Sequence, residues 1–265
     1  CTARDHETAR LRGRARGAPL SGFRARPLAA LFEDLISKVV DFHDTLVRNI
    51  KGMAVSQALF DDLSEDPEDN AVAIAAESAQ RIPSAAPLIT RPFDYGSVIT
   101  FPFIPYSWHA TRFSDGLRFG VWYGSLDIET TIHETVYHWH RFVMNSFANE
   151  NRVIRGERRV FSVRCQALLV DLRGKHRKFP KLCDRGDYAF GQQLGAYLEG
   201  QQQNGLLHHS ARCDGVNAAI LRPQVLSEPR DRCFLFYAMN PAQDRVVVKR
   251  GARKPWLTIK PSLLY

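Results

Sequence analysis

Long apolar stretches are missing from this chain. No window of its 265 residues approaches the roughly 18 consecutive apolar residues of a membrane-spanning helix. The basic N-terminal stretch is not followed by the apolar run and small-residue cleavage site of a secretory signal. Cysteine is also scarce, and the five cysteines form an odd set without a C-x-x-C pair, which argues against a disulfide framework or a zinc knuckle. We therefore expect a cytoplasmic protein that does not associate with a membrane.

Several short motifs are absent as well, and each absence removes a class of site. No G-x-G-x-x-G follows a strand and no G-x-x-x-x-G-K-[ST] occurs, so the usual phosphate-binding loops are missing. The segment HETVYH begins at His133, but its second histidine, His138, follows five residues later, whereas a zinc protease needs H-E-x-x-H. At about 100° per residue the two side chains point about 140° apart. We therefore expect no metal site.

Positive charge is concentrated at the start of the chain. The net charge is +8, and residues 1–30 contain seven arginines and only two acidic residues. That segment accounts for +5 and leaves +3 for the other 235 residues, so the body of the chain is nearly balanced. Residues 1–26 fit a nucleic-acid-binding arm, a disordered basic tail, or upstream sequence translated from a misplaced start, since the first methionine is Met53. They carry no part of the functional interpretation.

Apolar periodicity predicts the helices and strands. Residues 27–51 place apolar side chains at steps of three and four, with Pro27 suited to a first turn, which predicts a long amphipathic helix. Asp127 is the expected N-cap of another helix. The further helices are expected at residues 71–80, 127–147 and 187–203. Strands are expected at residues 97–104, 118–125, 159–172, 215–221, 232–239 and 245–250.

The order of these elements indicates the fold class and the domains. Strands cluster late in the chain and do not alternate regularly with helices, which favours an α+β fold over a doubly wound parallel sheet. A proline-punctuated stretch ends near Arg91. We therefore divide the chain into a basic tail or non-native start at residues 1–26, a helical segment at 27–90 and the main domain, a compact mixed sheet with flanking helices, at 91–265.

One short stretch combines a basic residue, an aromatic strand and a carboxylate on a helix. Glu134 lies at the edge of the apolar stripe of the 127–147 helix, so its carboxylate is able to reach a cleft without entering the core. Arg112 precedes a D-G turn, and its planar guanidinium matches the oxygens of a diphosphate. Tyr123 alternates with Trp122 on a strand, so one of the two is expected to line a pocket. The alternative for Glu134 and Arg112 is a solvated surface position.

A second candidate segment is GLLHHSARCDGVNAAILRP, at residues 205–223. Ser210 is not part of G-x-S-x-G, so no nucleophile elbow is predicted. A hydroxyl flanked by His209 and Arg212 is able to bind a ribose or a phosphate by hydrogen bonding. The alternative is a loop serine that bonds to the backbone.

Four segments of the chain, taken in order, resemble the RES domain, the toxin component of bacterial RES–Xre toxin–antitoxin pairs. They are ATRFSDG with Arg112, GVWYGSLDIETTIHE with Tyr123 and Glu134, LLVDLRG at residues 168–174, and GLLHHSARCDGVNAAIL with Ser210, Arg212 and Asn217. The resemblance covers residues 91–247, about six tenths of the chain. It departs from the family before the serine, where a Tyr-Pro pair is common and this chain has His208 and His209.

The resemblance implies a fold akin to ADP-ribosyltransferase toxins and an enzyme that depletes NAD by hydrolysis or phosphorolysis of the nicotinamide–ribose bond. It implies catalytic roles for Glu134, Arg112 and Ser210, and substrate-binding roles for Tyr123, Arg212 and Asn217. Glu134 would hydrogen-bond the nicotinamide ribose, and Ser210 would help to fix that ribose or a phosphate. Arg112 would bind the diphosphate or ribose, and Tyr123 would pack against the nicotinamide. NAD is then the substrate, and no cofactor is implied.

The resemblance also implies partners. An Xre-type helix-turn-helix antitoxin would cover the cleft, and nucleic acid would be contacted only through that antitoxin. A homo-oligomer is left open. Two other functions also stay open from the sequence: a mono-ADP-ribosyltransferase that modifies a cellular protein, and a non-catalytic nucleic-acid-binding module that uses the basic start of the chain.

Overall fold

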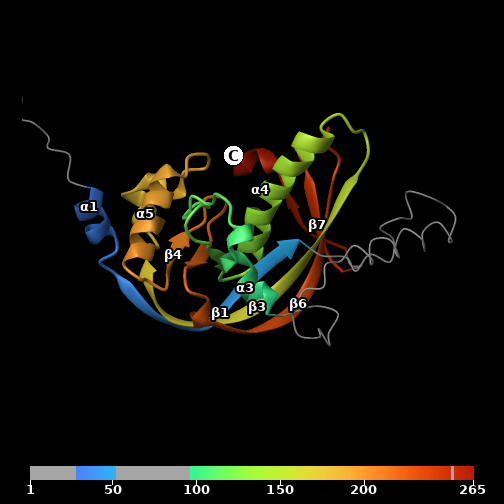
Figure 1. Cartoon of the computed structure of the whole chain (residues 1–265). Helices are drawn as coiled ribbons and strands as arrows, with labels where there is room; N and C mark the ends of the chain where they lie inside the picture. The colour runs from blue at the N-terminus through green and yellow to red at the C-terminus, as the bar shows by residue number, and fades with distance from the viewer. Residues whose placement is uncertain (1–27, 52–95, 252–253) are drawn as a thin grey trace, which may run out of the picture.

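The computed structural model describes residues 28–51, 96–251 and 254–265. Within these ranges the chain forms an eight-stranded sheet with helices packed against it, which confirms the α+β class (Figure 1). The strands are β1 Val39–Lys51, β2 Trp122–Ser125, β3 Ile154–Asp171, β4 Gly205–His209, β5 Val216–Ile220, β6 Leu226–Met239, β7 Val246–Arg250 and β8 Pro255–Ile259. The helices are α1 Leu28–Leu35, α3 Ser97–Thr100, α4 Ile128–Phe147 and α5 Ala189–Gly200. Short 3-10 segments are η1 Phe101–Phe103, η2 Pro105–Ser107, η3 Lys175–Arg177, η4 Pro180–Cys183, η5 Pro223–Val225 and η6 Pro261–Leu264.

The sheet curls back on itself. Its order is β1-β2-β5-β4-β3-β6-β7-β8, and β1 pairs additionally with β3. Every residue of β1 has an antiparallel partner on β3, while Val47 of β1 also pairs with Ser125 of β2. The pairings therefore run from β1 through β3, β4, β5 and β2 back to β1. This ring places the end of β2, at Ser125, beside Val47 in the middle of β1.

The long helix α4 packs across this sheet (Figure 1). Ile132 and Val136 are fully buried against Val47 of β1 and Leu235 of β6. Asp127 caps the helix, because its carboxylate accepts hydrogen bonds from the backbone nitrogen and the hydroxyl of Thr130, both at 2.7 Å. The predicted helix and its N-cap are therefore confirmed. Glu134 lies between two buried positions of this helix, close to the sheet without being part of the core.

The prediction of one long helix at residues 27–51 is wrong in its second half. The helix α1 ends at Leu35, and residues 39–51 form β1. Short apolar clusters such as Val39–Val40 and Leu46–Val47 fit a strand as well as a helix when they are read locally. Pairing with β3 along the whole segment decides the outcome. Part of the expected helical segment 27–90 is thus a strand of the main sheet, whereas the helix expected at 71–80 and the boundaries at residues 26 and 90 lie outside the described residues.

The prediction of a strand at residues 97–104 is also wrong. The chain there forms α3 followed by η1. Pro102 and Pro105 fix φ and lack a backbone N–H, so the segment is unsuited to a sheet ladder. The helical turn places Val98 and Ile99 in the core instead. Of the strand expected at 118–125, only residues 122–125 pair.

The later elements follow the predictions more closely, with shifted ends. The helix α5 and the strands β3, β5, β6 and β7 lie where they were expected. The sequence interpretation missed β4 and β8, two five-residue strands. The first omission matters for the site, because β4 carries His208 and leads directly into Ser210.

Candidate functional site

A cleft of about 560 Å³ opens between α4, the middle of β1, β2 and the segment that precedes β2. This volume is typical of small-molecule sites. Glu134 lies on one wall and Arg112 on another, and Tyr123 and Asn217 also line the cleft. A second cavity, of about 580 Å³, lies beside the end of α5 and contains none of the candidate residues. The first cleft is therefore the candidate site.

Glu134 is held in place by two side chains from different strands. Its Oε1 accepts a hydrogen bond from the hydroxyl of Ser210 and another from the amide of Asn217, each at 2.7 Å. Asn217 is itself oriented, because its Oδ1 accepts a hydrogen bond of 2.6 Å from Ser125. Across the described part of the chain, no group bonds to Oε2 of Glu134. One oxygen thus fixes the carboxylate, and the other is left for a ligand.

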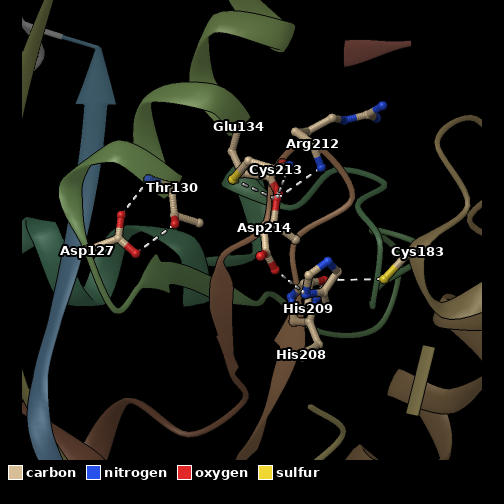
Figure 2. Close-up of polar contacts among 10 residues, drawn as sticks. Asp127, Thr130, Glu134, Cys183, His208, His209, Arg212, Cys213 and Asp214 are labelled. Atoms are coloured by element: carbon tan, nitrogen blue, oxygen red, sulfur yellow. Dashed lines mark hydrogen bonds and ion pairs between the residues drawn. The ribbon is translucent and has the colours of Figure 1, made fainter. Parts of the chain in front are cut away.

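Ser210 lies beneath the carboxylate and does not line the cleft. Only 2% of its surface is exposed. While its hydroxyl donates to Glu134, its oxygen accepts from the backbone nitrogens of Arg212 at 3.0 Å and Cys213 at 3.3 Å. Figure 2 shows the loop with Arg212 and Cys213 directly beside Glu134 on its helix. The turn therefore uses Ser210 to orient Glu134.

Arg212 lies behind the site. Its guanidinium donates to the carbonyl oxygens of Leu264 and Arg185 and rests 3.5 Å from the ring centroid of Tyr137. The side chain is buried and is absent from the cleft wall. Its contacts connect the turn after β4 to α4 and to the last residues of the chain. The structure thus places Arg212 in a supporting position, whereas the sequence interpretation expected substrate contact.

Arg112 is fixed at the other side of the cleft by backbone and by an aromatic ring. It donates to the carbonyl oxygens of Leu182 and Asp184, at 3.2 and 2.7 Å. Its guanidinium also lies 4.7 Å from the ring centroid of Tyr188, which lines the same cleft. These contacts use one of the two terminal nitrogens, Nη1. The planar group is therefore pre-oriented, as a site for an anionic ligand requires.

Tyr123 lines the cleft, and its hydroxyl fixes the Arg112 segment. The hydroxyl donates to Thr111 at 2.9 Å and accepts from the backbone nitrogen of Phe113 at 3.1 Å. Burial raises the pKa of Tyr123 to about 12. The phenol therefore stays protonated at neutral pH. Its neighbour Trp122 is fully buried, so Tyr123 is the member of the pair that faces the cleft.

A polar network forms the end of the cleft nearest to β1. The amide nitrogen of Asn49 donates to Thr135 at 3.1 Å and to the hydroxyl of Tyr237 at 3.0 Å. The guanidinium of Arg158 donates to the side-chain oxygen of Asn49 at 3.0 Å. Burial lowers the pKa of Arg158. The sequence interpretation missed this network, because Asn49 is separated from Thr135, Arg158 and Tyr237 by 86, 109 and 188 residues along the chain.

Two histidines of the cleft were not predicted to belong to it. His208 is 3% exposed, its Nδ1 lies 2.9 Å from the carbonyl oxygen of His209, and burial lowers its pKa to about 4. His138 lies one helical turn after Glu134 and is exposed on the cleft wall, and desolvation of its ring is the main cause that lowers its pKa. The i, i+4 spacing from Glu134 is the signal that indicates a shared face.

The predicted residues thus fall into two groups. Arg112, Tyr123, Glu134 and Asn217 line one cleft, whereas Ser210 and Arg212 support it from behind.

No three His, Cys, Asp or Glu side chains converge as a metal site requires within the described ranges. The helices in those ranges are all too short or too polar to cross a membrane.

Comparison with known proteins gives a family and a structural similarity at low sequence identity. A family model described as the RES domain matches residues 78–239, which is more than half of the chain. No curated protein matches the sequence. One chain from the crystal structure of the M. tuberculosis MbcT–MbcA toxin–antitoxin complex is 12% identical, with a TM-score of 0.44. That similarity covers 82% of this chain and 96% of the other.

Proposed function

The chain belongs to the RES domain family, and from this membership and the geometry of the cleft we propose that it is an enzyme that cleaves the nicotinamide–ribose bond of NAD. The observation that carries the proposal is the shared cleft, in which the carboxylate of Glu134 and the guanidinium of Arg112 are each fixed by hydrogen bonds. A dinucleotide offers a complementary pair of groups: a ribose that becomes positively charged and a diphosphate that is already negative.

The chemistry of the bond explains why a positioned carboxylate is useful. Nicotinamide leaves NAD as a neutral molecule and takes the bonding electrons with it, so positive charge develops on the ribose. A fixed negative group beside that ribose lowers the barrier, because it needs no reorganisation when the charge appears. Glu134 is suited to this role since Ser210 and Asn217 hold one of its oxygens and leave the other unbonded.

The part of the cleft around Arg112 is suited to the rest of the substrate. Arg112 would pair with the diphosphate through its remaining nitrogens, and the ring of Tyr188, with its centroid 4.7 Å from the guanidinium carbon, would help to hold it there. Tyr123 would pack against the nicotinamide end. Binding energy from the adenylate half would then hold the ribose against Glu134. Ser210 and Asn217 take part by orienting the carboxylate.

We also propose a cellular role on the basis of family membership. Depletion of NAD would make the protein a toxin in the cytosol, held inactive by an Xre-type helix-turn-helix antitoxin. The antitoxin would cover the cleft and would provide the contact with DNA. Co-purification from the native operon tests this role, and recovery without any small helix-turn-helix partner would contradict it.

Product analysis tests the enzymatic proposal. Purified protein is incubated with NAD, nicotinamide release is followed with time, and the ADP-ribose-containing products are identified by mass spectrometry. Free ADP-ribose indicates hydrolysis, an ADP-ribose 1″-phosphate indicates phosphorolysis, and a protein that has gained ADP-ribose indicates a transferase. Absence of nicotinamide release at any protein concentration would contradict the proposal.

A further inference from the structure

His138 and Glu134 lie on the same face of α4, one helical turn apart. Both side chains line the cleft, and residues at i and i+4 are neighbours on a helix surface. The two other histidines of α4 are oriented differently. His133 has Nδ1 at 2.9 Å from the backbone oxygen of Glu129, and His140 has Nδ1 at 2.8 Å from the hydroxyl of Tyr265. Neither of them lines the cleft.

The imidazole of His138 has no hydrogen bond to any described residue. Its ring contact is with Tyr137, whose ring meets it edge-on at 5.1 Å between centroids. His208, the other unpredicted histidine of the cleft, differs because its Nδ1 is engaged by a backbone oxygen. Both ring nitrogens of His138 are therefore available to a molecule in the cleft.

The surroundings of His138 lower its pKa, which favours the neutral imidazole at physiological pH. Glu134 is the one acidic neighbour and raises the pKa, whereas Arg212, Arg141 and Arg158 lower it. Desolvation of the ring makes the largest contribution to a pKa below the ordinary value of 6.5, although His138 is exposed on the cleft wall. A neutral imidazole has one ring nitrogen with a free lone pair, so it is able to accept a proton at pH 7.

We propose that His138 is the general base that accepts a proton from the water molecule attacking the nicotinamide ribose. The water oxygen forms a bond to the anomeric carbon, C1″, while the bond from that carbon to the nicotinamide nitrogen breaks. Its electron pair leaves with nicotinamide, and the water proton passes to the imidazole and later to solvent. The products are nicotinamide, ADP-ribose and one proton. Glu134 stabilises the charge on the ribose and His138 activates the nucleophile, so the two side chains of one helical turn have separate tasks.

This role rests on the proposed function and makes it more specific. A phosphate ion or a deprotonated nucleophile needs no general base, whereas a water molecule at neutral pH benefits from one. The proposed role of His138 therefore applies to water as the attacking group and to hydrolysis as the reaction.

The test compares His138→Gln with a matched control, His133→Gln, on the same helix. For His138→Gln we expect kcat to fall by about 100-fold with KM within about twofold of the wild type, because proton transfer occurs only in the transition state. The wild-type kcat should decrease at pH values below the pKa of His138, because the protonated imidazole cannot accept a proton. This decrease should be absent from the variant. His133→Gln should keep the wild-type kcat and pH profile.

Azide provides a second readout that a merely structural role would not change. It attacks the same carbon without losing a proton and should restore nicotinamide release by His138→Gln at least tenfold, with ADP-ribosyl azide as product. Two results would overturn this role alone, provided that the wild type releases nicotinamide. One is a kcat of His138→Gln equal to that of the wild type, and the other is a lowered kcat that azide does not restore. Absence of nicotinamide release by the wild type would overturn the proposed function together with it.

Discussion

At the scale of single residues, the position of Glu134 depends on neighbours that are remote in sequence. Ser210 and Asn217 both donate to the same oxygen, and they follow Glu134 by 76 and 83 positions. A carboxylate with a fixed orientation stabilises a developing charge better than a mobile one, because it does not have to reorganise. The site is therefore expected to be sensitive to substitutions that never touch a ligand.

Replacement of Ser210 by alanine tests this dependence. The variant loses one donor to Glu134 and also leaves the backbone nitrogens of Arg212 and Cys213 without their acceptor. We expect a stability loss of about 1–3 kcal/mol from the unpaired buried groups. The kcat for nicotinamide release should fall by roughly tenfold, with KM little changed. Thermal unfolding and steady-state kinetics measure both effects, and an unchanged kcat would show that Ser210 does not orient the carboxylate.

Sequence reasoning placed Glu134 on the cleft-facing side of its helix but did not foresee its hydrogen bond from Ser210. The first prediction was possible because its signals are local: an aspartate N-cap and an apolar stripe define α4 and the face on which Glu134 lies. The second depends on which strands are neighbours in the sheet, and β4 was not predicted at all. Asn49 was missed because it lies on β1, which was predicted to be helical, whereas His138 was missed although its i, i+4 spacing from Glu134 indicates a shared face.

At the scale of elements, α5 fixes the segment that carries Arg112. Gly191 and Gly195 allow this close packing, since an added Cβ would lie 2.3 Å from the backbone oxygen of Arg112 and 1.9 Å from that of Phe113. Real Cβ atoms do not approach other atoms so closely. Helix and segment would have to separate if either glycine acquired a side chain.

The substitution Gly191→Ala tests the importance of this contact. Overpacking of a well-packed interface typically costs about 1–3 kcal/mol, and displacement of Arg112 should lower kcat/KM for NAD by about tenfold, since misplacement of about 1 Å is enough for such losses. Gly200→Ala is the matched control on the same helix, because nothing lies within 4 Å of its added Cβ. A kcat/KM equal to that of the control would mean that α5 does not position Arg112.

The main error of sequence reasoning also belongs to this scale. Residues 39–51 were predicted to be helical because short apolar clusters satisfy both the helical and the strand period. Their β conformation follows from the partner strand β3, which lies more than a hundred residues further along the chain. By contrast, α4 is specified by its own cap and stripe, so it was predicted with the correct ends.

At the scale of the whole molecule, the pairing of β1 with β3 closes the sheet around the cleft, and ion pairs strengthen one end of it. Asp171, the last residue of β3, has a fully buried carboxylate that lies 2.7 Å from Nζ of Lys38 and 2.8 Å from Nε of Arg173. The hydrogen bonds from Arg173 and Lys38 hold its pKa well below the ordinary value. Its contribution to stability is therefore present above about pH 4 and is lost as the pH falls towards the lowered pKa.

The variant Asp171→Asn should reveal this pH dependence. At pH 7 we expect the free energy of unfolding to decrease by roughly 1–3 kcal/mol, since both ion pairs are lost while the shape of the side chain is kept. The difference from the wild type should become smaller when the pH is lowered from 5 to 2. Denaturant unfolding at several pH values measures it, and a difference that stays constant down to pH 2 would contradict the assignment.

The central claim is that the carboxylate of Glu134 stabilises the positive charge that develops on the ribose of NAD. The most direct measurement is nicotinamide release by Glu134→Gln, which keeps an oxygen able to accept from Ser210 and Asn217 but removes the negative charge. We expect release to fall by at least about 100-fold, with a thermal unfolding midpoint close to that of the wild type. Wild-type release of nicotinamide by this variant would contradict the account.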